Sequence, residues 1–77
     1  MAHSTIQDWT QSEVLLKFDE AREVKYRVYR DRGCLFQEIC DVDDTPIHTL
    51  ELPDDMKMDR NSYEVLLRYV LLDVVAA

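Results

Sequence analysis

The sequence predicts one small α+β domain over residues 1–77, in which a three-stranded antiparallel meander is flanked by an N-terminal and a C-terminal helix. Three observations support this fold class. A helix-start pattern lies near the N-terminus, three strand-like runs separated by turn formers follow it, and a strongly apolar helical segment comes last. A length of 77 residues is typical of one domain with a modest core.

The N-terminal segment admits two interpretations. Residues 1–9 are expected to form a flexible arm, and Thr10, Gln11, Ser12 and Glu13 fit a capping box at the start of a helix. Apolar residues at positions 14, 15, 18 and 21 share one face of that helix, and residues 19–23 contain no turn former. The alternative is a strand over residues 14–18, which gives a four-stranded antiparallel sheet plus one C-terminal helix.

Three strands are predicted in the middle of the chain, over residues 24–30, 34–40 and 47–52. The first is the clearest, because it alternates strictly at first and is rich in β-branched and aromatic residues. Gly33, the only glycine, can take a positive φ in the turn at 31–33. A two-residue turn lets seven apolar residues share one sheet face, whereas a three-residue turn shifts the later strands by one and places apolar residues on both faces. Both registers remain open for these residues: Val24, Tyr26, Val28, Leu35, Ile39, Leu50 and Leu52.

The C-terminal helix is predicted from an N-cap at Asn61 to about Val75. One apolar stripe comprises Tyr63, Leu66, Leu67, Val70, Leu71 and Val74, and a second stripe comprises Val65, Tyr69 and Leu72. Burial of each such side chain is worth roughly 1.5–3 kcal/mol. The second stripe is therefore expected to be covered, either by the N-terminal segment with Trp9 or by a second copy or another protein.

Charge is unevenly distributed along this acidic chain, whose net charge is −7. Residues 37–59 carry eight acids and one Lys, which favours a basic protein surface as partner and disfavours phosphate backbones. The acidic candidates for partner binding are Asp41, Asp43, Asp44, Glu51, Asp54, Asp55 and Asp59. A basic strand offers the alternative of nucleic-acid binding, or is an ordinary solvated sheet face with Glu38 as a neighbour. Its candidates are Lys25, Arg27, Tyr29, Arg30 and Arg32.

Motifs for chemistry are weak, so we expect no enzyme, no metal and no cofactor. Residues 41–45 match the D-x-D-x-T spacing of haloacid-dehalogenase-type phosphatases, but those enzymes need a much larger parallel domain, and a polar turn explains the residues. The spacing of Cys34, Cys40, His3 and His48 fits no zinc site. One glycine leaves no phosphate loop or nucleophile elbow. Without a signal-peptide pattern or a membrane-length apolar run, we expect a cytoplasmic protein.

The expected function is that of a non-enzymatic interaction protein, a regulator or inhibitor that binds a basic surface of a nucleic-acid-handling protein complex. Its profile is similar to that of small acidic regulators of nucleic-acid machinery, including phage-borne or mobile-element inhibitors. The order helix, three strands, helix also resembles the double-stranded RNA-binding domain, but residues 54–61 lack that family's lysine cluster. The alternatives are a nucleic-acid-binding module, a homodimeric accessory protein, and an enzyme around Asp41, Asp43 and His48.

Overall fold

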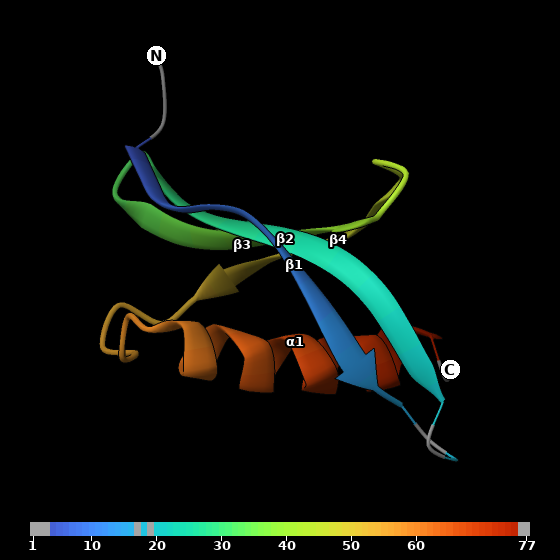
Figure 1. The fold of residues 1–77 in the computed structure, drawn as a ribbon. Helices are drawn as coiled ribbons and strands as arrows, with labels where there is room; N and C mark the ends of the chain where they lie inside the picture. Colours follow the sequence, from blue (N-terminus) through green and yellow to red (C-terminus); the bar gives the residue numbers. More distant parts are fainter. Residues whose placement is uncertain (1–3, 17, 19, 76–77) are drawn as a thin grey trace.

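The described part of the chain folds as one antiparallel sheet with one helix packed on one of its faces (Figure 1). The computed structural model describes residues 4–16, 18 and 20–75, and side chains as far as Leu72. The strands are β1 (Ser4–Leu15), β2 (Ala21–Asp31), β3 (Cys34–Asp41) and β4 (Pro46–Leu52), and the helix is α1 (Arg60–Val75). The sheet order β1-β2-β3-β4 makes a meander with β1 and β4 at its edges.

The N-terminal segment is a strand, so the four-stranded alternative is correct and the predicted first helix is wrong. Ser12 and Val14 are buried while residues 11, 13 and 15 are exposed, which is the period of a strand with one face on the core. The hydroxyl of Ser12 donates to Glu64 Oε1 at 3.0 Å and caps no helix. Pairing with β2 therefore overrides the helix-like spacing of the apolar residues.

The predicted flexible arm is also corrected, because residues 4–9 belong to β1. Register irregularities between Thr5 and Thr10 leave this half of the strand imperfectly paired. The Trp9 ring is nevertheless held by two cations of β2, with Lys25 Nζ and Arg27 Cζ each 5.1 Å from its centroid. These cations lie on the sheet face opposite the helix, so Trp9 does not cover α1. Residues 1–3 lie outside the described residues.

The turn between β2 and β3 contains two residues, which settles the register that the sequence left open. Asp31 pairs with Cys34, and Arg32 and Gly33 both have positive φ, 54° and 79°. This is the type I′ geometry that matches the twist of a hairpin. All seven apolar residues of the predicted face then point toward α1. The core comprises Val14, Val24, Tyr26, Val28, Leu35, Ile39, Leu52, Tyr63, Leu67 and Leu71, with Leu50 and Ile47 packed against it.

Replacing Arg32 by Asn is expected to stabilise this hairpin. Arg32 has a left-handed φ of 54°, which is unfavourable for most side chains, whereas Asn is preferred at the first central position of a type I′ turn. We expect the free energy of unfolding to rise by about 0.5 kcal/mol, measured by urea titration. Gly33→Ala is the opposing control and should lower it by about 1 kcal/mol. An unchanged or lower stability of Arg32→Asn would contradict the type I′ assignment.

The helix begins at Arg60 and is capped by Asp59, two residues before the predicted N-cap, so the assignment of Asn61 as N-cap is wrong. The amide of Ser62 donates to Asp59 Oδ1 at 2.8 Å, and the amide of Tyr63 donates to the Asp59 carbonyl at 3.2 Å. The bond from Ser62 satisfies an amide that has no partner within the helix and holds the pKa of the Asp59 carboxyl below its usual range. Asp59 and Asn61 are both good capping residues, and the sequence alone does not rank them.

Candidate protein-interaction surface

The second apolar stripe of α1 lies at the surface of the described part of the chain. Val65 is 49% exposed and Tyr69 is 68% exposed, and Leu72 is half-buried. The first stripe behaves differently, because Tyr63, Leu67 and Leu71 are at most 1% exposed. Val65, Arg68, Tyr69 and Leu72 together line a shallow hollow of about 280 Å³. The predicted cover by the N-terminal segment is not found among the described residues.

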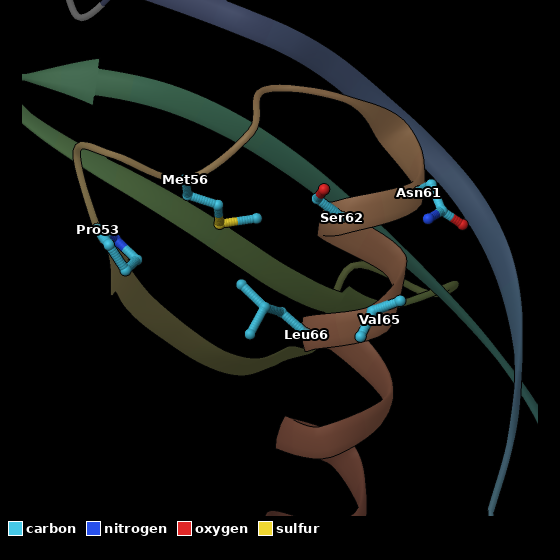
Figure 2. A pocket seen from close by; sticks show the side chains of 6 residues that line it. All are labelled: Pro53, Met56, Asn61, Ser62, Val65 and Leu66. Carbon is cyan, nitrogen blue, oxygen red and sulfur yellow. The ribbon is translucent and has the colours of Figure 1, made fainter.

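A second hollow of about 340 Å³ lies between α1 and the loop that follows β4 (Figure 2). In the view of Figure 2, the Met56 side chain extends from the loop toward the helix, and the Leu66 side chain extends from the helix toward the loop. Its lining residues are Pro53, Met56, Asn61, Ser62, Val65 and Leu66. Val65 lines both hollows, so they adjoin along the helix. We call the two hollows together the α1 groove.

The acidic candidates fall into two groups at opposite ends of β4. Asp41, Asp43 and Asp44 lie at the turn between β3 and β4, whereas Asp54, Asp55 and Asp59 lie in the loop before α1 (Figure 1). A seven-residue strand separates the groups by roughly 20 Å. Glu51 belongs to β4 itself, opposite Phe36. Only the second group adjoins the α1 groove, because Pro53 and Met56 of the same loop line it.

Several of these carboxylates have ion-pair partners and still face water. The pairs are Asp41–Arg22 at 3.3 Å, Asp44–Lys25, Asp54–Arg30 at 3.6 Å and Asp59–Lys57 at 3.4 Å. The side chains of Asp44 and Asp54 are each 79% exposed, so their pairs add little stability. Hydrogen bonds from Thr45 lower the pKa of Asp43. Asp55 and Glu51 have no ion pair among the described residues.

The basic candidates are not all brought together. Lys25, Arg27 and Tyr29 share the outer sheet face. Arg30 pairs with Leu35 on the core-facing side, and Arg32 lies in the turn. Arg27 contacts Glu38 at 2.7 Å across the ladder, and Lys25 contacts Asp44. The Tyr29 ring stacks on Phe36 with centroids 5.6 Å apart. The positive charges of this face are thus matched by carboxylates of the same chain.

The residues considered for chemistry have ordinary structural contacts. Asp41 pairs with Arg22, and Asp43 Oδ1 accepts a hydrogen bond from the Thr45 amide at 3.1 Å, which are contacts of a polar turn. His48 pairs with Ile39 across the ladder. Burial raises the pKa of the Cys40 thiol, which makes it a poor nucleophile. Among the described residues, no three His, Cys, Asp or Glu side chains are grouped to hold a metal ion.

Sequence reasoning found the helix side of the α1 groove and missed its loop side. Pro53 and Met56 belong to no periodic pattern, and only the path of the loop brings them to Leu66. No helix in the described part of the chain is long and apolar enough to cross a membrane. Comparison with known protein families, curated proteins and solved structures finds no significant match to the chain. The fold and its surfaces therefore define only a class, a four-stranded antiparallel α+β domain with an uncovered helix face.

Proposed function

We propose that this chain is a non-enzymatic interaction protein that binds a basic surface of a nucleic-acid-handling protein and thereby regulates or inhibits it. The observation that supports this function is the imbalance of charge beside an apolar face. Of the basic residues described, six pair with carboxylates of the chain itself: Arg22, Lys25, Arg27, Arg30, Lys57 and Arg60. The excess charge of −7 is therefore negative charge that is available to a partner.

Two physical effects would act together at such an interface. Exposed carboxylates raise the rate at which a basic partner is encountered and favour its orientation. Val65 and Tyr69 would supply the apolar centre of the contact, and Asp54 and Asp55 would lie at its polar rim. A partner that handles nucleic acid offers a basic surface of this kind in the cytoplasm.

Direct binding of nucleic acid is less well supported. Phosphate contacts need available cations, and Lys25, Arg27 and Arg30 each contact a carboxylate. A nucleic acid would have to displace Asp44, Glu38 and Asp54 and would meet a net charge of −7. A gel-shift assay with single- and double-stranded DNA and RNA checks this, and we expect no shift at micromolar protein in low salt.

Neutralising four loop carboxylates is expected to weaken binding to basic protein surfaces. The test variant carries Asp43, Asp44, Asp54 and Asp55 changed to Asn, and its probes are purified DNA- and RNA-binding proteins with basic surfaces. Binding of the native chain should be strong at about 50 mM salt and lost at about 500 mM, because salt screens exposed charges. The variant should bind at least about ten-fold more weakly in low salt.

A matched control removes the same number of charges from the β1–β2 hairpin, with Asp8, Glu13, Glu20 and Glu23 changed to their amides. Because these positions belong to β1, β2 and the segment between them and not to the two acidic loops, the control should retain most of the binding. Equal binding by the loop variant and the native chain would refute a role for the loops. Equal loss in both variants would show that only net charge matters.

A further inference from the structure

We propose that the α1 groove binds an amphipathic helix of the partner, with apolar side chains of that helix in the two hollows and its Lys or Arg residues beside the loop at 53–59. This inference rests on the proposed function and assigns its partner a shape. The groove and the loop at 53–59 would recognise different features of that helix. The groove would bind its apolar stripe, and the loop would bind its positive charges.

The spacing of Val65 and Leu72 along the groove matches the spacing of side chains on a helix. Val65 and Leu72 are separated by seven residues of α1, which is roughly 10 Å along the axis. An amphipathic helix presents apolar anchors at i, i+3 or i+4, and i+7 over the same distance. Val65 lies between the two hollows. One apolar side chain of the partner helix in each hollow would therefore enclose the side chain of Val65. The exposed Asn61 amide at the rim offers a polar contact.

Charge at the loop end of the groove favours a basic partner segment. Asp55 has no ion pair among the described residues, and Asp54 is 79% exposed with a long contact of 3.6 Å to Arg30. Both lie between Pro53 and Met56, which line the groove. Arg68 lies at the other hollow and donates to the Leu15 carbonyl at 3.2 Å. A second copy of the chain would bring its own net charge of −7 against these acids, so charge matches a basic helix better.

The probe for this proposal is a synthetic peptide of Leu and Lys, about 15 residues long, with its leucines in one helical stripe. A second peptide of the same composition has its leucines scattered around the helix. Fluorescence anisotropy at about 150 mM salt should show at least about ten-fold tighter binding of the striped peptide. Equal binding of the two peptides to the native chain would overturn the proposal.

Val65→Asp separates apolar docking from charge attraction. The change adds a negative charge that attracts lysines, yet it should weaken binding of the striped peptide at least about ten-fold by placing a carboxylate in the groove. Val42→Asp is the matched control, since Val42 is 50% exposed and Val65 is 49% exposed, and Val42 lies in the β3–β4 turn. The control should bind as well as the native chain. Equal affinities of the two variants would overturn the proposal.

Further measurements distinguish failure of the groove proposal from failure of the proposed function. Tyr69→Ala removes a 68% exposed ring without adding a charge and should also weaken binding of the striped peptide. This second variant tests the groove if Val65→Asp does not fold. If the four-Asn loop variant loses the basic proteins while Val65→Asp keeps the striped peptide, the groove proposal fails and the proposed function stands. If Val65→Asp loses the striped peptide while the loop variant still binds the basic proteins, the proposed role of the acidic loops fails and the groove proposal stands. A native dimer that Val65→Asp dissociates would assign the groove to a second copy and overturn the proposal.

Discussion

Replacing Leu67 by Ala is expected to remove a large fraction of the stability of the protein. Leu67 is 0% exposed and lies in the core between α1 and the sheet. Removal of a buried Leu side chain costs about 2–5 kcal/mol, because the transfer energy is lost and a cavity remains. A domain of this length has a total stability of only about 4–12 kcal/mol. Urea titration followed by far-ultraviolet circular dichroism and Trp9 fluorescence measures the loss.

The matched control for this prediction is Val65→Ala on the same helix. Val65 is 49% exposed, so its truncation should change the free energy of unfolding by less than about 1 kcal/mol. Trp9 lies on the sheet face opposite α1, and its fluorescence therefore reports on the sheet while circular dichroism reports largely on the helix. Coincident transitions would indicate that sheet and helix unfold together. A similar loss of stability in both variants would contradict the assignment of the two stripes.

The sequence was informative where burial follows apolar periodicity. The strands around residues 24–30, 34–40 and 47–52 and the C-terminal helix are where the patterns placed them, with ends within a few residues. The first element was misassigned because its buried position 12 is a serine. A strand whose inward residues include Ser12 shows no apolar alternation, and the chance spacing of residues 14, 15, 18 and 21 then resembles a helix.

Buried polar residues also make it hard to predict from the sequence which residues face the core. Gln37 is 0% exposed, and its Nε2 donates to the Tyr63 carbonyl at 3.1 Å, which links β3 to α1. Hydropathy treats such a residue as outward-facing, although its alternation with Leu35 and Ile39 placed it on the inner face once the register was known. The register itself depends on whether two or three residues form the turn. The backbone angles of Arg32 and Gly33 decide that, and they are not encoded by residue type alone.

The candidate surface was predictable on the helix and less so in the loops. Three apolar residues at spacings of four and three beside the inner stripe indicated a second apolar face that needs a cover. Within the described part of the chain Val65 and Tyr69 are exposed, so the N-terminal segment does not supply that cover. The sequence showed that the acidic candidates gather within residues 37–59 and left open how near they lie to one another in space. An extended strand between the two acidic groups carries them to opposite ends of β4, so closeness along the chain does not become closeness in space.

Glu64→Gln is expected to lower the free energy of unfolding near neutral pH by about 1 kcal/mol, which is below the usual range for a charged hydrogen bond because the carboxylate is partly exposed. Glu64 joins the helix to the first strands. Its Oε1 accepts from Ser12 at 3.0 Å, and its Oε2 accepts from Tyr26 at 3.4 Å and from Arg60. Burial alone would raise the pKa of Glu64, but the hydrogen bonds from Arg60 and Ser12 outweigh it and leave the pKa lowered.

The sign of the pH dependence follows from this lowered pKa. The folded state holds the Glu64 proton less readily than the unfolded state, so the stabilisation is fully present above the ordinary value of 4.5 and is lost as pH falls through the folded pKa. The stability difference between the native chain and Glu64→Gln should therefore shrink toward zero in acid. Urea titrations over this pH range measure it, with Glu51→Gln as the control because Glu51 has no ion pair among the described residues. A difference independent of pH would mean that Glu64 supports the β1–α1 contact by its shape and not by its charge.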